Sequence, residues 1–123
     1  MNKNTQKLFM AGVLLTIASA IDASAAGANT PFGPLTVTDA GTYGSGAIFI
    51  NLSANINAPG CNANNRIDIP ASSPLTKQIL AMALQALATG ATVSGMVNGC
   101  DPSSGNATID TTYNSWFIVY PVN

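Results

Sequence analysis

One helical pattern lies among segments that otherwise alternate like strands, and it limits the fold more than any other feature. Between Ser72 and Gly90 the chain reads "SSPLTKQILAMALQALATG". Ser73 suits the N-cap, Pro74 suits the first helical position, and Gly90 suits the left-handed residue beyond the last turn. The pattern therefore predicts one helix of about 15 residues. Because strand patterns lie on both sides of it, we expect the helix to cover an end or a face of a sheet.

The first 25 residues have the pattern of a secretory signal peptide. Lys3 and Lys7 precede the apolar run "LFMAGVLLTIASAI", and Ala25 closes a small-x-small cleavage pattern. The apolar run has about 14 residues, fewer than the roughly 20 that span a bilayer. We therefore expect cleavage after residues 1–25 and a secreted or periplasmic protein that starts near Ala26 and does not insert into a membrane.

The remaining chain, about 98 residues long, is enough for one domain. We expect an N-terminal arm and a first short strand at 26–45, followed by the core of the domain at 46–123. This part holds two cationic side chains against four carboxylates. Two cations do not make a phosphate-binding surface, so nucleic acid and anionic lipid are not expected partners.

Cys61 and Cys100 are the only cysteines of the chain. In an oxidising compartment such a pair is most simply a disulfide that closes a long loop. The competing interpretation is a metal or redox site, but the chain has no histidine and no CxxC spacing. We therefore predict a structural disulfide, with no metal and no cofactor.

Strand patterns occupy five segments, and their order around the helix predicts the fold. The segments are "LTVTD" (35–39), "AIFINLSANI" (47–56), "RIDIP" (66–70), "TVSGMVNG" (92–99) and "SWFIVYP" (115–121), with "ATIDTTY" (107–113) as a further strand or an irregular edge. Three strands, one helix and two strands is the element order of the OB-fold. We predict an α+β, mainly β fold: an OB-fold-like five-stranded barrel with one helix between strands 3 and 4. An open α+β sheet with the helix on its face is the alternative.

The predicted helix carries two apolar stripes. One comprises Leu75, Ile79, Met82 and Ala86, and the other comprises Leu80, Leu84 and Leu87. A domain of this size has little protein with which to cover both. Two interpretations stay open: the core wraps the helix deeply, or the second stripe faces a neighbouring subunit of a homo-oligomer.

Catalytic patterns are mostly excluded by the lack of histidine, which removes Ser-His and Cys-His pairs and an imidazole base. Asp101 and Asp110 flank a Gly/Ser loop and could form a carboxylate pair or a calcium site, but turn capping accounts for Asp101. Lys77 fits a solvated helix position. We predict that the protein is not an enzyme; a small exported hydrolase that works without histidine is the enzymatic alternative.

Aromatic residues beside polar loop segments favour sugar binding, because ring faces stack on sugar CH groups while amides and hydroxyls meet the sugar hydroxyls. The segments concerned are "TYGSG", "NGCDPSSGN" and "TTYNSW". Trp116 also fits a core position of the last strand. The candidate ligand-binding residues are Tyr43, Ser45, Asp101, Asn106, Tyr113, Asn114 and Trp116.

Between Gly46 and Tyr120 the pattern "GAIFI…C…NRIDIP…PLTKQILAMALQALATGATVSGMVNGC" resembles short exported bacterial proteins with one disulfide. More remotely, it is similar to the binding (B) subunits of subtilase-cytotoxin and pertussis-type toxins. The resemblance rests on element order, the helix–turn–strand junction and the position of Cys100. It implies an OB-fold, a ring-shaped homo-oligomer and binding of host glycans, with a toxin A subunit as a further partner. The glycan-contacting loop of those toxins has no residue-by-residue match here, so no site residue carries over.

A fimbrial pilin is the alternative function, since the chain also resembles an exported, Thr/Asn/Gly-rich fibre subunit with one disulfide and a C-terminal strand ending near Tyr120. An all-β pilin sandwich has no place for the predicted helix.

Overall fold

The computed structural model of the protein describes residues 29–109 and 115–123. These residues form five strands and one helix. They are β1 (Thr30–Thr42), β2 (Ile48–Leu52), β3 (Arg66–Ile69), α1 (Thr76–Thr89), β4 (Thr92–Val97) and β5 (Trp116–Val119). The strands form one antiparallel sheet in the order β3-β2-β1-β4-β5. The prediction of a mainly β chain with one helix between the third and fourth strands is confirmed.

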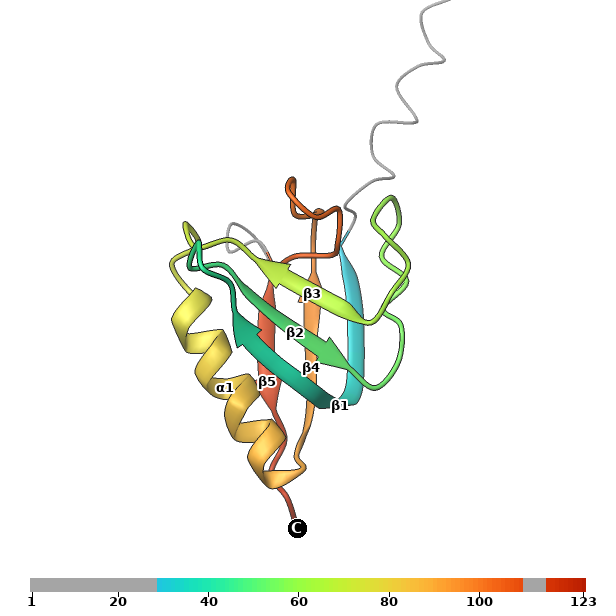
Figure 1. Cartoon of the computed structure of the whole chain (residues 1–123). Coiled ribbons are helices and arrows are strands. Elements are labelled where there is room, and N and C mark those ends of the chain that lie inside the picture. Colours follow the sequence, from blue (N-terminus) through green and yellow to red (C-terminus); the bar gives the residue numbers. More distant parts are fainter. Residues whose placement is uncertain (1–28, 110–114) are drawn as a thin grey trace, which may run out of the picture.

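The long strand β1 gives the sheet its shape. It extends well beyond the short strand predicted at 35–39, because its N-terminal half pairs with β4 and its C-terminal half pairs with β2. Its register shifts between Phe32 and Leu35 and again between Val37 and Asp39. Such bulges bend and twist a strand. The sheet is accordingly curved, and β2 and β3 lie in front of β4 and β5 in Figure 1.

The sheet is open, because β3 and β5 are the two ends of the strand order. A closed barrel is therefore not confirmed. Among the described residues, Ala107 of the chain beyond β4 forms an isolated bridge to Ile67 of β3 and another to Cys100. Hydrophobic alternation in the sequence shows which face of a strand is buried, but not which strand edges meet.

The core lies between the inner face of the curved sheet and α1. In β2 the predicted alternation is confirmed, with Ile48, Ile50 and Leu52 at most 2% exposed. The rings of Phe32 and Phe117, from β1 and β5, lie 6.4 Å apart inside it. The largest fully buried side chains are Ile48, Ile50, Leu52, Ile67, Ile69, Ile109, Val93 and Val97.

The helix ends as predicted and begins differently. Gly90 has the expected left-handed conformation, with φ 76°, and its N–H donates to the Ala86 carbonyl over 2.8 Å. The predicted N-cap Ser73 is wrong: the N-cap residue is Leu75, without a side-chain cap. The hydroxyl of Thr76 instead donates to the Pro70 carbonyl over 2.7 Å. A turn between Pro70 and Ser73 delays the start of the helix, so the capping signal lies too early in the chain.

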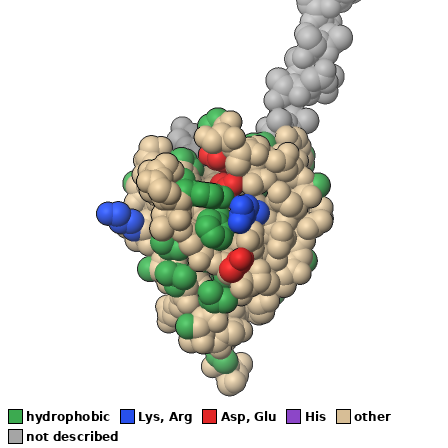
Figure 2. Space-filling model, in the orientation of Figure 1, with side chains coloured by type: hydrophobic (Ala, Val, Ile, Leu, Met, Phe, Trp, Pro, Cys, Tyr) green, Lys and Arg blue, Asp and Glu red, His purple; other side chains and the backbone are tan. Residues whose placement is uncertain are grey.

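The buried face of α1 consists of Thr76, Ile79, Ala83 and Ala86. Of the predicted second stripe, Leu80 is half-buried, whereas Leu84 is 44% and Leu87 39% exposed. The core of a single chain therefore does not wrap the helix, and hydrophobic side chains are visible on the surface over α1 in Figure 2.

The predicted disulfide between Cys61 and Cys100 is confirmed, with Cα atoms 5.5 Å apart. It joins the loop before β3 to the chain just after β4. Within the described residues, no helix is long and apolar enough to cross a membrane.

Candidate functional site

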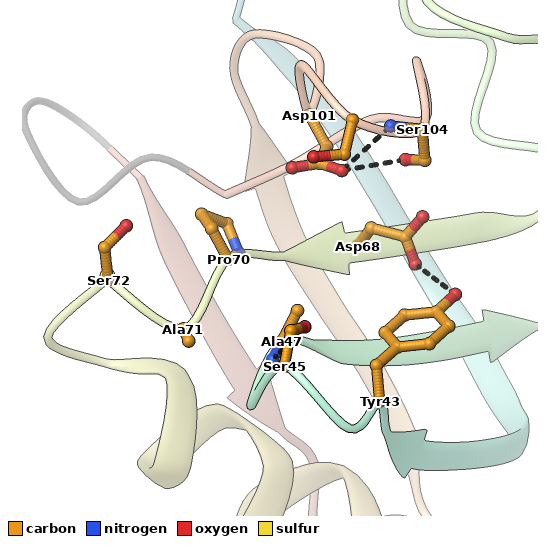
Figure 3. Close-up of a pocket in the computed structure, with 10 residues that line it drawn as sticks. Tyr43, Ser45, Ala47, Asp68, Pro70, Ala71, Ser72, Asp101 and Ser104 are labelled. Atoms are coloured by element: carbon orange, nitrogen blue, oxygen red, sulfur yellow. Dashed lines mark hydrogen bonds between the residues drawn. The ribbon is translucent and has the colours of Figure 1, made fainter.

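A pocket of about 600 Å³ opens where the β1–β2 turn, the end of β3 and the loop after Cys100 meet (Figure 3). This volume is within the range of small-molecule sites. The lining residues combine one aromatic ring, small apolar groups, hydroxyls and two carboxylates: Tyr43, Ser45, Ala47, Asp68, Pro70, Ala71, Ser72, Asp101, Ser103 and Ser104.

The β1–β2 turn sets the position of Tyr43. The N–H of Tyr43 donates to the Ala47 carbonyl over 2.8 Å, and the N–H of Gly46 donates to the Tyr43 carbonyl over 2.9 Å. Gly46 has φ +93°, which a residue with a side chain rarely adopts. Tyr43 packs against Phe49, with ring centroids 5.3 Å apart, yet stays 40% exposed. One part of the ring is therefore anchored while another stays open to a ligand.

The Tyr43 hydroxyl is held between a carboxylate and a guanidinium. It donates to Oδ1 of Asp68 over 3.3 Å and accepts from Nη1 of Arg66 over 3.1 Å. Arg66 is fixed in turn, because its Nε donates to Oδ1 of Asn51 over 3.0 Å and its guanidinium lies 4.5 Å from the centre of the Phe49 ring. This network sets the orientation of the phenol before any ligand arrives.

The pKa of the Tyr43 phenol lies above its ordinary value of 10.0. Burial is the largest cause, and the negative charge of Asp68 raises the pKa further, while Arg66 lowers it. The phenol is therefore protonated at neutral pH and can donate its hydrogen bond to Asp68.

Asp68 lines the pocket but was not among the predicted ligand-binding residues, and neither were Ser72, Ser103 and Ser104. The alternation of "RIDIP" places Arg66 and Asp68 opposite the two isoleucines, yet Asp68 is only 3% exposed. Its Oδ2 accepts from Nδ2 of Asn106 over 2.8 Å. An isolated aspartate in a short strand was the only signal, because its cover comes from Tyr43 and Asn106, which are distant in the chain.

Asn106 links Asp68 to the loop before β3. Its Oδ1 accepts from Nδ2 of Asn64 over 2.7 Å and from Nδ2 of Asn62 over 3.2 Å. Asn106 is 8% exposed and thus almost completely enclosed. Asn62 and Asn64 thus fix the Asn106 amide, and Asn106 in turn restricts the rotation of the Asp68 carboxylate.

The loop after Cys100 forms the upper wall of the pocket in Figure 3. Oδ2 of Asp101 accepts from the N–H of Ser104 over 3.1 Å and from its hydroxyl over 3.0 Å. The carbonyl of Asp101 accepts from the N–H of Gly105 over 2.7 Å. The neighbouring disulfide ties this turn to Cys61, so the covalent bond helps to hold the wall in place.

The structure brings together part of the predicted ligand-binding set. Tyr43, Ser45 and Asp101 line the pocket, and Asn106 is hydrogen-bonded to the lining residue Asp68.

Trp116 does not join this group. It lies on β5, opposite Met96 of β4, is 39% exposed, and is absent from the pocket lining. The sequence neighbourhood of Trp116 resembles that of Tyr43, but only the sheet order decides which aromatic residues share a face. Tyr113 and Asn114 lie outside the described residues.

Among residues 29–109 and 115–123, no group of three His, Cys, Asp or Glu side chains could hold a metal ion. Asp110, considered above as a partner of Asp101, lies outside the described residues. The carboxylate that accompanies Asp101 in the pocket lining is Asp68.

No protein-family model, curated protein or solved structure matches the chain. The geometry of the pocket is therefore the basis on which a function can be argued.

Proposed function

We propose that the protein is an exported, non-enzymatic, glycan-binding protein that holds its ligand in the Tyr43 pocket. The observation that carries the proposal is a fixed, 40% exposed tyrosine ring beside two carboxylates and several serine hydroxyls in one cavity of about 600 Å³. Sugars present an apolar CH face and a ring of hydroxyls, and this pocket offers a partner for each.

The apolar part of the pocket consists of the Tyr43 ring with Ala47, Pro70 and Ala71. Because Arg66 and Asp68 already hold the hydroxyl of Tyr43, a stacking sugar need not order the ring. Such preorganisation lowers the entropic cost of binding.

The polar part consists of acceptors held in place. Oδ1 and Oδ2 of Asp68 accept from Tyr43 and Asn106, and Oδ2 of Asp101 accepts from Ser104. Carboxylates fixed in this way suit the binding of sugar hydroxyls, whereas a hydrolase needs one of them to release a proton to the leaving group. For this reason we favour binding over hydrolysis.

An OB-type barrel is the fold we propose for the complete chain. Its support is the element order together with the bridges of Ala107 to Ile67 of β3 and to Cys100 beyond β4. The bridge to Ile67 brings the chain beyond β4 to the β3 edge of the sheet, and closure of that edge is what an OB-type barrel requires. Similarity to the toxin B subunits belongs to this proposal, and α1 favours it over a pilin-like fibre subunit, because an all-β sandwich has no helix on its sheet.

We further propose that the chain forms a homo-oligomer through α1. Leu84 and Leu87 are exposed, and Leu80 is half-buried beside them. From Gln78 to Cys100 the chain carries no charged residue, so nothing on this helix beyond its first turn opposes apolar contact. A second copy offers the same uncharged stripe.

A glycan array probed with the oxidised protein lacking residues 1–25 tests the binding function. We expect the wild type to bind a glycan, and Tyr43→Ala to bind it at least about tenfold more weakly, because the substitution removes a stacking contact and its hydrogen bonds. Tyr120→Ala is the matched control, because Tyr120 is similarly exposed, at 37%, and does not line the pocket. Absence of any glycan binding by folded protein would refute the proposal.

Light scattering at tens of micromolar concentration tests the oligomer. Leu84→Glu should yield monomers with an unchanged circular dichroism spectrum, whereas Gln78→Glu, an exposed change on the same helix, should leave the oligomer intact. A monomeric wild type would rule out this interface.

A further inference from the structure

Among the described residues, the lining of the Tyr43 pocket carries two negative charges and no positive one. Asp68 and Asp101 both line it, and no Lys or Arg is among the lining residues. Both aspartates are largely buried, at 3% and 8% exposed, so water screens their charge less than it would at the surface. Figure 2 shows acidic side chains beside a hydrophobic group, with one basic side chain close by and a second at the edge of this face.

The nearest cation is committed elsewhere. The guanidinium of Arg66 donates to the Tyr43 hydroxyl and to Asn51, and it lies over the Phe49 ring. Lys77 lines a separate hollow at the start of α1, with Gly46 and Gln78. Neither side chain supplies a free positive group to an anionic ligand in the Tyr43 pocket.

Resting on the proposed glycan-binding function, we infer that this pocket selects uncharged and amine-bearing sugars and rejects acidic ones such as sialic acids. A ligand carboxylate placed among Asp68 and Asp101 meets two like charges in a partly desolvated space. A sugar hydroxyl instead donates a hydrogen bond to the Asp101 carboxylate, and a protonated amine makes that hydrogen bond charge-assisted.

Asp101 is the carboxylate that contacts the ligand. Asp68 has one oxygen occupied by Tyr43 and the other by Asn106, so its role is to supply charge and to orient the phenol. Asp101 lies on the loop after Cys100 with Ser103 and Ser104, and its Oδ2 accepts hydrogen bonds from Ser104. We assign the donor group of the sugar to Oδ1 of Asp101.

Calorimetric titration of the wild-type protein tests this inference with three probes: the best neutral glycan found on the array, the same glycan carrying a terminal sialic acid, and its 2-amino analogue. We expect the sialylated form to bind at least about tenfold more weakly than the neutral one, and the amine to bind at least as tightly. Added salt should reduce the differences in affinity between the neutral glycan and the two charged ones.

The Asp101→Asn variant keeps the shape of the side chain and one acceptor oxygen. It should bind the neutral glycan more weakly than the wild type does and discriminate less against the sialylated glycan. If this variant does not fold, the ratio of the wild-type affinities for the neutral and the sialylated glycan still tests the inference. Equal or tighter binding of the sialylated form would overturn the inference while leaving glycan binding intact. Failure to bind any of the probes, in contrast, would refute the proposed function itself and this inference with it.

Discussion

A hydrogen bond between Asn106 and Asp68 joins the loop after Cys100 to strand β3. Nδ2 of Asn106 donates to Oδ2 of Asp68 over 2.8 Å, and both residues are buried. Because Asp68 also accepts from Tyr43, this contact links the packing of the loop to the orientation of the pocket's aromatic ring.

Asn106→Asp should destabilise the protein by about 3 kcal/mol, because it replaces the donor with a second carboxylate in an enclosed space. Chemical denaturation at neutral pH measures this loss. The loss should shrink at acidic pH, where the two carboxyl groups can share a proton. Asn55→Asp, the same change at an exposed position, should alter the stability by less than about 0.5 kcal/mol. Equal effects at the two positions would contradict the role assigned to Asn106.

Tyr43 should make the stability of the protein depend on alkaline pH. Burial, with the charge of Asp68, raises the pKa of the folded-state phenol, so the folded protein holds this proton more tightly than the unfolded chain does. The corresponding stability is fully present below the unfolded pKa of about 10 and is lost as the pH rises through the folded pKa. Denaturation between about pH 8 and 11 should show a steeper decline for the wild type than for Tyr43→Phe. Identical slopes would show that the phenol does not have this environment.

Removal of the disulfide in the Cys61→Ala, Cys100→Ala double variant should cost about 3 to 4 kcal/mol, because the bond restricts a long loop of the unfolded chain. Urea denaturation followed by circular dichroism measures the change. Reduction of the wild-type protein should reproduce it, and glycan binding should weaken as well, since Asp101 follows Cys100 directly. A loss below about 1 kcal/mol would contradict this account of how the bond stabilises the protein.

Gly95 should not tolerate a side chain. A Cβ there would lie 2.7 Å from ring atoms of Phe32 and 2.7 Å from the carbonyl oxygen of Trp116. Gly95→Ala is therefore expected to destabilise the protein by about 2 kcal/mol, as overpacked cores do. Gly44→Ala is the matched control, since no atom lies within 4 Å of its Cβ position. Thermal unfolding of the two variants should separate clearly, and similar melting temperatures would contradict the close packing at Gly95.

Several elements were predictable because their signals are local. The left-handed Gly90, the alternation of β2 and the position of the helix between two groups of strands each depend on a few consecutive residues. The disulfide was predictable because only two cysteines exist. The start of α1 was not, because the turn from Pro70 to Ser73 takes the place of the expected cap.

The residues of the pocket, likewise, were predictable only as far as local signals allow. Tyr43 and Asp101 were expected to bind a ligand, yet the sequence could not place them in one cavity or separate them from Trp116. Asp68 was missed, because an aspartate at an alternating strand position is ordinarily solvated.

The sequence by itself determined the strand and helix order, the covalent link between Cys61 and Cys100, and the lack of histidine chemistry. All three are properties of residue types and of short periodic patterns. Only the tertiary structure decided that the sheet is open, that β1 serves two neighbouring strands, and that Asp68 lies buried beneath Tyr43 and Asn106. All three features depend on contacts between separate segments of the chain, which no local pattern predicts; the two hydrogen bonds of Asp68, for example, join residues 25 and 38 positions apart.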